Sequence, residues 1–137
     1  MSESVQNIQS IQNVLIKVEF EGLPPTVNHM YMNAQGRRFR TKECREFQDK
    51  TTLILKSLWS KEPYLGRVAL SVDFLTSNRR RWDLDNRLKA LQDCLQLSGV
   101  IKDDSQVDAI FLKRCYSKKN ATILILSEIS DIFIPFE

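Results

Sequence analysis

The sequence predicts a single α/β (α+β) domain in which two main helices pack on a mixed β-sheet. Three observations lead to this fold class. Strand-like and helix-like patterns follow one another in the order β-α-β-α-β-β, the 137 residues suit one globular domain, and 42% of them are hydrophobic. We therefore expect one domain over residues 1–137, with peripheral ends at 1–13 and 129–137 that could lie at a dimer interface.

The first half of the chain predicts one strand and one helix. Residues 14–20 (VLIKVEF) alternate apolar and polar side chains, as a half-buried strand does, and a Gly-Leu-Pro-Pro stretch ends the pattern. Residues 26–40 predict a loop rich in arginine. Thr41 is a suitable N-cap for a helix that runs to about residue 59. The apolar stripe of this helix consists of Cys44, Phe47, Ile54, Leu55 and Leu58.

The second half predicts three strands and a helix. Residues 67–75 give the clearest strand, because every second side chain from Val68 to Phe74 is apolar. Leucines at helical spacing predict a helix from Asn86 to about residue 97, and Gly99 follows its end. Residues 107–116 and 121–126 predict two more strands, most simply joined as a hairpin by a polar turn.

The charge is concentrated in the middle of the chain. Residues 36–119 hold 19 of the 20 Lys and Arg side chains against 11 of the 17 Asp and Glu, a balance of +8, while the two ends together carry −5. A basic segment with embedded carboxylates suits a protein that approaches a polyanion and holds a divalent cation there. A solvated basic surface is the simpler alternative.

Several classes of protein are disfavoured. No apolar run is long enough for a membrane helix, and the first residues lack the pattern of a secretion signal, so we expect no membrane partner and a cytoplasmic location. The three cysteines, Cys44, Cys94 and Cys115, are odd in number and widely spaced. This argues against a disulfide framework or a zinc site, and we expect all three to be buried thiols.

The most informative stretch is an acidic cluster inside the basic segment. Asp83 and Asp85 point the same way if the chain is extended there, and Asp85 can then cap a helix that begins at Asn86. Lys89 would come round one turn later, near Asp85. A loop after the helix could return Asp104 to the same place, with Asp103 as an auxiliary carboxylate.

Three converging carboxylates would repel one another unless a cation lay between them. Oxygen ligands without a His or Cys companion select Mg²⁺, with Mn²⁺ as a possible substitute, and such an ion suits phosphate hydrolysis. Asp83, Asp85 and Asp104 are therefore candidate metal ligands, and Lys89 would either contact the scissile phosphate or hold one of these carboxylates in place. The candidate DNA-binding residues are Arg37, Arg38, Arg40, Arg79, Arg80, Arg81 and Arg87.

Other interpretations of these residues stay open. Asp85 and Lys89 could be only a cap and its salt-bridge partner, and the basic face could belong to a non-catalytic DNA-binding module. An aspartyl phosphatase is disfavoured, because its D-x-D motif usually follows a buried strand directly. Trp82 could stack on a DNA base or a junction arm, but packing is the simpler interpretation. The single histidine, His29, is more simply a loop residue than a catalytic base. The apolar segment 132–136 should pack on the core or on a partner subunit.

Two motifs make the sequence resemble the RusA family of Holliday junction resolvases. The first is residues 22–31, GLPPTVNHMY, in which Thr26 replaces the commoner serine of the family. The second is DLDN at residues 83–86 with Lys89, followed by Gly99 and by DDSQV at residues 103–107. The similarity covers most of residues 14–127.

The resemblance implies a function and assigns residues to it. The family's three catalytic aspartates fall on Asp83, Asp85 and Asp104, and its important lysine falls on Lys89. A RusA-like protein would be a Mg²⁺-dependent endonuclease, that is, a crossover junction endodeoxyribonuclease. It would act as a homodimer whose two sites make paired, symmetric nicks in a four-way DNA junction.

Overall fold

The computed structural model describes residues 11–129 of the chain. The expected packing of the apolar segment 132–136, and most of the two peripheral ends, lie outside the described residues. Within them, one mixed sheet and two main helices form a single domain, which confirms the predicted fold class.

The central sheet has four strands in the order β1-β6-β4-β5. They are β1 (Ile11–Glu21), β4 (Val68–Thr76), β5 (Val107–Tyr116) and β6 (Ala121–Ile129). β6 pairs antiparallel with both β1 and β4, whereas β4 and β5 are parallel. The sheet is therefore mixed, and the parallel pair β4 and β5 is joined through the second main helix.

The predicted hairpin of the last two strands is wrong. β6 does not pair with β5 but lies between β1 and β4, while β5 forms the edge of the sheet. Burial explains this order: Leu124 and Leu126 of β6 are completely buried, whereas β5 exposes Ile110 and Phe111. The more apolar strand takes the central position, where both of its neighbours shield it from water.

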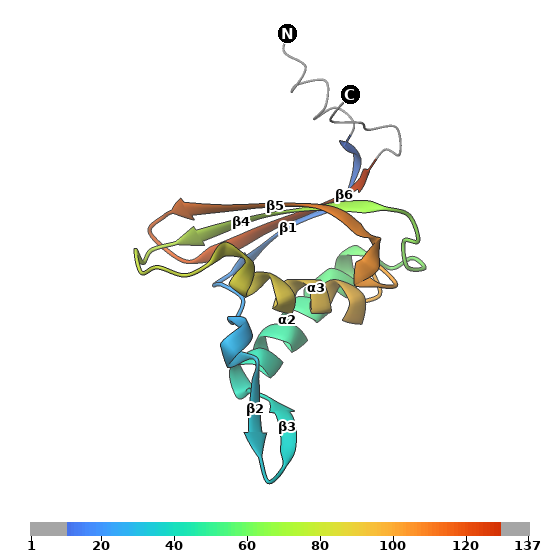
Figure 1. Cartoon of the computed structure of the whole chain (residues 1–137). Coiled ribbons are helices and arrows are strands. Elements are labelled where there is room, and N and C mark those ends of the chain that lie inside the picture. Colours follow the sequence, from blue (N-terminus) through green and yellow to red (C-terminus); the bar gives the residue numbers. More distant parts are fainter. Residues whose placement is uncertain (1–10, 130–137) are drawn as a thin grey trace, which may run out of the picture.

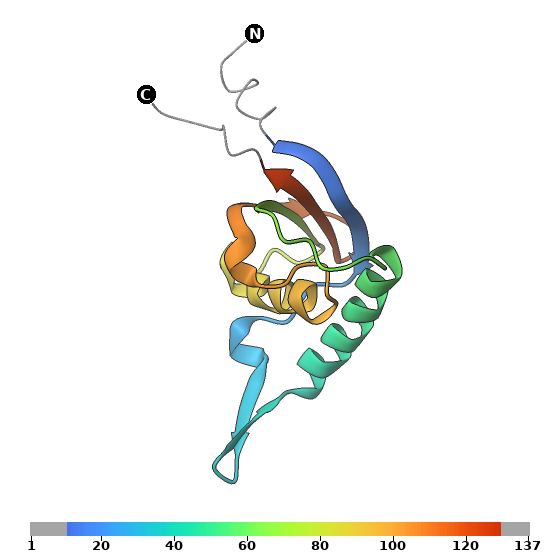
Figure 2. The ribbon, with the colours of Figure 1, turned by 90° about the vertical axis from the view of Figure 1, so that its right-hand side faces the viewer.

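Both helices cover the same side of the sheet (Figures 1 and 2). They are α2 (Lys42–Leu58) and α3 (Leu88–Leu97). Thr41 caps α2 as predicted, because its side chain accepts a hydrogen bond from the Cys44 backbone N–H. Leu58, predicted in the apolar stripe, is half-exposed, and the buried face of α2 contains Gln48 and Thr51 instead.

The residues predicted as a loop before α2 contain a β-hairpin. After a short 3₁₀ helix η1 (Val27–His29), strands β2 (Tyr31–Ala34) and β3 (Arg37–Arg40) pair antiparallel and project from the body (Figure 1). The turn between them has positive φ at Gln35 and at Gly36, as a two-residue type I′ turn requires. Gly accepts this backbone freely, and Gln is a weaker turn signal than Asn or Asp, which is why the turn was missed.

The cysteines are free thiols, but only two of the three match the prediction. Cys44 and Cys94 are buried, and burial raises the pKa of Cys94 to about 12, so this thiol stays protonated and unreactive. Cys115 is half-buried on the edge strand β5. None of the helices in the described part of the chain has the length and apolar character that a membrane crossing demands.

Candidate active site

The segment that carries Asp83 and Asp85 leads into α3 through a 3₁₀ turn, η2 (Leu84–Arg87). Asp83 is extended, as predicted, but Asp85 lies inside this turn rather than at the N-cap of a helix. The α-helix begins only at Leu88, so the predicted start at Asn86 is two residues early. No described side chain caps either η2 or α3, and both acidic side chains are exposed.

Trp82 anchors the segment just before these acids. Its ring meets the Phe74 ring edge to face, with the two centroids 5.5 Å apart, and the guanidinium groups of Arg87 and Arg114 lie over it, 4.7 and 4.5 Å from its centroid. Arg114 also donates a hydrogen bond to the Trp82 carbonyl. The packing interpretation of Trp82 fits these contacts, which fix the chain immediately before Asp83.

Asp104 lies in a second 3₁₀ turn, η3 (Asp104–Gln106), which leads into β5. Asp103 and Gln106 form a capping box around this turn, and the buried Gln106 amide also donates to the carbonyls of Tyr64 and Gly66. The hydrogen bond from Ser105 lowers the pKa of Asp103. The turn therefore holds Asp104 in a fixed, exposed position. The Asp103 side chain is used to cap this turn.

Lys89 forms its closest ion pair with Asp93, one turn further along α3, and not with Asp85 as predicted. The Lys89 Nζ donates to Asp93 Oδ1 at 2.7 Å. This hydrogen bond raises the pKa of Lys89, and the charges of Asp93 and Asp104 act in the same direction. Lys89 is thus a protonated side chain that Asp93 orients and that the negative charge of Asp104 also stabilises.

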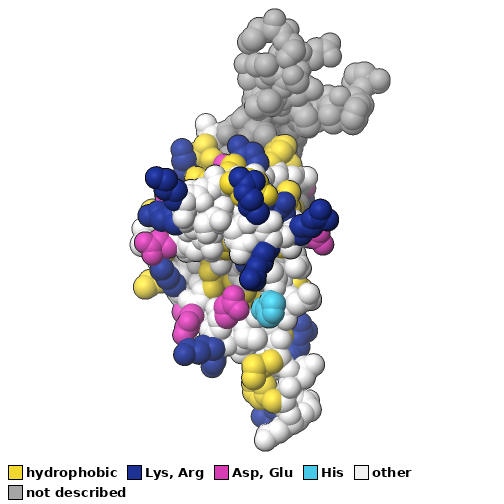
Figure 3. Space-filling view, turned by 90° about the vertical axis from the view of Figure 1, so that its left-hand side faces the viewer, with side chains coloured by type: hydrophobic (Ala, Val, Ile, Leu, Met, Phe, Trp, Pro, Cys, Tyr) yellow, Lys and Arg dark blue, Asp and Glu magenta, His cyan; other side chains and the backbone are white. Residues whose placement is uncertain are grey.

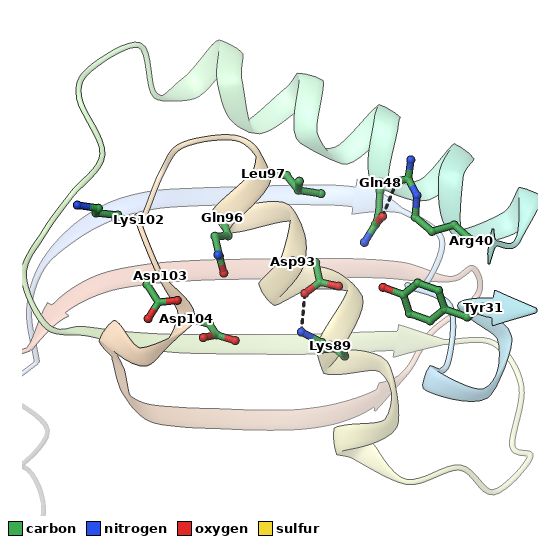
Figure 4. Close-up of a pocket in the computed structure, with 10 residues that line it drawn as sticks. All are labelled: Tyr31, Arg40, Gln48, Lys89, Asp93, Gln96, Leu97, Lys102, Asp103 and Asp104. Atoms are coloured by element: carbon green, nitrogen blue, oxygen red, sulfur yellow. Dashed lines mark hydrogen bonds and ion pairs between the residues drawn. The ribbon is translucent and has the colours of Figure 1, made fainter. Parts of the chain in front are cut away.

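These groups share one polar pocket of about 900 Å³ (Figure 4). It joins the hairpin, both helices and the turn before β5. The residues that line it are Tyr31, Arg40, Gln48, Lys89, Asp93, Gln96, Leu97, Lys102, Asp103 and Asp104. Of the four predicted site residues, Lys89 and Asp104 line this pocket, whereas Asp83 and Asp85 do not.

The carboxylates suit Mg²⁺ in their chemistry but not in their arrangement. Asp93, Asp103 and Asp104 supply hard oxygen ligands, and the pocket wall contains no thiol or imidazole. However, residues 11–129 contain no group of three or more His, Cys, Asp or Glu side chains that could hold one metal ion. The predicted convergence of Asp83, Asp85 and Asp104 is not seen in this conformation.

The predicted DNA-binding arginines fall into two groups. Arg37, Arg38 and Arg40 lie exposed on the hairpin, and Arg79, Arg80 and Arg81 lie exposed in the segment after β4. Figure 3 shows one face of the molecule on which many Lys and Arg side chains are exposed. These six arginines are available to an anionic partner.

Arg87 differs from the other predicted arginines. It is half-buried, stacks on Trp82 and donates to the Pro24 carbonyl at 2.5 Å. Burial lowers its pKa. These contacts favour a structural role for Arg87 in joining the start of α3 to the chain after β1.

Sequence reasoning missed part of the pocket. Asp93 follows Lys89 by four residues on a predicted helix, so the i,i+4 spacing could have identified it as the partner. Tyr31, Gln48 and Gln96 gave no such signal, because their positions depend on how the hairpin and the helices pack. The His29 Nδ1 atom forms a hydrogen bond of 2.7 Å with the Thr26 hydroxyl, which fits a role within its loop. His29 does not line the pocket.

Comparisons with known proteins agree with the sequence resemblance. The family model described as "Endodeoxyribonuclease RusA" matches residues 21–126. The protein named crossover junction endodeoxyribonuclease RusA from Shigella sonnei (strain Ss046) is 33% identical over 84 residues, which cover 61% of this chain and 70% of the relative. The namesake from Escherichia coli (strain K12) is 32% identical over the same shares. The one from Aquifex aeolicus (strain VF5) is 22% identical over 111 residues, or 80% of this chain and 88% of the relative.

Proposed function

Because the chain belongs to the RusA family of endodeoxyribonucleases, we propose that it is an endonuclease that resolves Holliday junctions. The relatives are named for action on crossover junctions, and this name supplies the substrate class. The proposed products are paired, symmetric nicks in a four-way junction. DNA is then the principal partner.

The observation that carries this proposal is the meeting of Lys89 and Asp104 in one exposed polar pocket. A protonated amine beside a carboxylate can bind a phosphodiester oxygen, while the carboxylate can accept a proton from an attacking water or hold a cation near the phosphorus. In our proposal Lys89 contacts the scissile phosphate and Asp93 positions its amine. Lys89 therefore stabilises the negative charge that grows as the ester bond breaks.

We further propose that Asp83, Asp85 and Asp104 hold a divalent cation, Mg²⁺ or, as a substitute, Mn²⁺. When bound, such an ion would supply a more acidic water and a positive charge next to the phosphate. Because the three acids do not form one group in the described chain, binding requires a local movement. η3 is held by its capping box, whereas no described side chain caps η2. The rearrangement therefore belongs to η2, between the anchors at Trp82 and Arg87.

The three arginines of the segment after β4 are proposed to hold the DNA backbone next to this pocket. Arg79, Arg80 and Arg81 flank the acidic segment, so they would neutralise phosphates next to the cleaved one. Their contribution should fall steeply with salt concentration, since it depends on the release of counterions.

A homodimer completes the proposal. A four-way junction has approximate two-fold symmetry, and a symmetric dimer presents two identical sites related by the same rotation. Each chain would then cut one of two equivalent strands.

The proposal is tested with a synthetic four-way junction, in the presence and absence of Mg²⁺. We expect the wild-type chain to make two symmetric incisions only with Mg²⁺, and Asp83→Asn to make none while it still binds the junction. Asp73→Asn removes a carboxylate from the sheet strand β4 and serves as a control that should cut normally.

Two outcomes would contradict the proposal. Failure of the wild-type chain to incise any junction, or equal cutting by Asp83→Asn, would remove the assigned chemistry. Junction binding that Mg²⁺ and the aspartate substitutions leave unchanged, without cleavage, would identify a non-catalytic DNA-binding module instead.

A further inference from the structure

The projecting hairpin has two faces of different chemistry. Direct cross-strand partners in β2 and β3 lie on the same face, and successive residues alternate between faces. The pairs Tyr31 with Arg40 and Asn33 with Arg38 therefore share one face, here called the pocket-side face. The pairs Met32 with Phe39 and Ala34 with Arg37 share the other, here called the outer face.

The pocket-side face continues the wall of the candidate active site. Tyr31 and Arg40 at its base both line the pocket, and Tyr31 points its hydroxyl end toward Asp93 and Lys89 (Figure 4). The Arg38 guanidinium stacks on the Tyr31 ring with its Cζ 4.0 Å from the ring centroid. Cationic groups at Lys89, Arg40 and Arg38 thus extend from the pocket onto the hairpin.

The base of this face is held in place by a hydrogen bond and by buried packing contacts. Arg40 donates through Nη1 to the side-chain oxygen of Gln48 at 2.8 Å, and Gln48 is only 2% exposed. Met30, directly before the hairpin, is fully buried against Cys44 of α2 and Ala90 of α3. Ala90 is the neighbour of Lys89. The hairpin therefore holds a fixed position relative to the lysine of the pocket.

We propose that the pocket-side face binds the sugar-phosphate backbone of the DNA arm that leaves the cleavage pocket. This inference rests on the proposed function, because it takes the pocket as the place of cleavage. Arg38 lies over the Tyr31 ring and is exposed, so its guanidinium can donate to phosphate oxygens, while Arg40 would bind the phosphate nearer the pocket. Arg37 points to the outer face and takes no part in this contact.

Charge and geometry favour DNA over a second copy of this chain on this face. Two arginines and an asparagine amide are donors for phosphate oxygens, and stacking leaves Arg38 less conformational freedom to lose on binding. A pairing of two pocket-side faces would bring four arginines together without a described carboxylate on either hairpin. The outer face, where Met32 and Phe39 are 53% and 44% exposed, lacks this set of donors.

Arg37 and Arg38 provide a matched pair for the experiment, since they are neighbours of equal charge on opposite faces. Binding of a fluorescent four-way junction is measured by anisotropy in EDTA, from about 50 to 200 mM salt. We expect Arg38→Ala to weaken binding about tenfold, the effect of one charged hydrogen bond. The slope of log affinity against log salt should fall by about one. Arg37→Ala should stay within about twofold, with an unchanged slope.

Arg38→Lys guards against a folding defect, because it keeps the charge on an exposed strand position. It should restore the salt slope but only part of the affinity, since an ammonium group cannot stack on Tyr31 as a planar fork. Equal losses in Arg37→Ala and Arg38→Ala, or no loss in either, would overturn the inference. Cleavage by the wild-type chain is measured separately. Failure of the hairpin to contribute to binding can then be distinguished from failure of the chain to act as a nuclease.

Discussion

At the scale of single residues, Lys89 and Asp93 form an ion pair at the edge of the pocket. Lys89 faces the pocket, and the short hydrogen bond from its amine to Asp93 fixes where that amine lies. Asp93 raises the pKa of Lys89 above its ordinary value. Because the ordinary pKa of lysine is already far above 7, the amine is protonated at neutral pH with or without Asp93. A defect caused by removing Asp93 at neutral pH therefore reports the position of the amine and not its charge.

We expect Lys89→Ala to lower kcat for junction cleavage by about a hundredfold or more, the usual cost of removing one donor to a transition-state oxygen. Junction affinity should change by less than about threefold. Asp93→Asn should lower kcat by a smaller factor with an unchanged KM, because the amine remains but loses its orientation. Single-turnover cleavage and anisotropy measure the two quantities separately. Unchanged turnover in Lys89→Ala would reduce the lysine to a surface salt bridge.

At the scale of the elements, the Thr41 cap connects the hairpin to α2. Its hydroxyl accepts from the Cys44 N–H at 3.1 Å and donates to the His29 carbonyl at 2.6 Å. One side chain therefore starts the helix and closes the loop that leads into the hairpin. Because the contact with Cys44 spans only three residues, the sequence was enough to predict the cap.

Thr41→Ala should lower the free energy of unfolding by about 1 to 2 kcal/mol, the range for loss of an N-cap. Thr41→Ser keeps the hydroxyl and should stay within about 0.5 kcal/mol. Urea denaturation followed by circular dichroism measures both variants. An Ala variant as stable as wild type would mean that water or another group replaces both hydrogen bonds.

The elements also show where sequence reasoning succeeds and where it stops. The alternation in β4 and the leucine spacing of α3 follow from local periodicity, and both were predicted. The place of β6 between β1 and β4 depends on contacts between strands that are distant in sequence, so no local pattern could supply it. The hairpin was missed because Gln35 is an unusual residue at positive φ.

The candidate site shows the same division. The sequence predicted that a loop after the helix could return Asp104 toward Lys89, and both residues line the same pocket. The approach of Asp83 and Asp85 depended on the backbone just before α3. That segment forms a 3₁₀ turn whose position is set by Trp82 and Arg87, and neither contact can be read from residue spacing.

At the scale of the whole molecule, the proposed dimer follows from the symmetry of its substrate. Light scattering of the protein without DNA should give twice the chain mass of 16.0 kDa at working concentrations. The Arg38→Ala variant should keep this mass, because the pocket-side face is assigned to DNA. A species of 16.0 kDa that still cuts junctions symmetrically would remove the dimer from the proposal.

In our proposal Asp83, Asp85 and Asp104 share one cation beside Lys89, although Asp83 and Asp85 lie at the start of η2 and Asp104 lies in η3. Mn²⁺ binding to the complex of protein and junction, followed by electron paramagnetic resonance, tests this directly. We expect Asp83→Asn and Asp104→Asn each to abolish the same bound Mn²⁺, and the double variant to lose nothing further, since coupled ligands are not additive. An Asp104→Asn complex that binds Mn²⁺ as tightly as wild type would contradict the shared site.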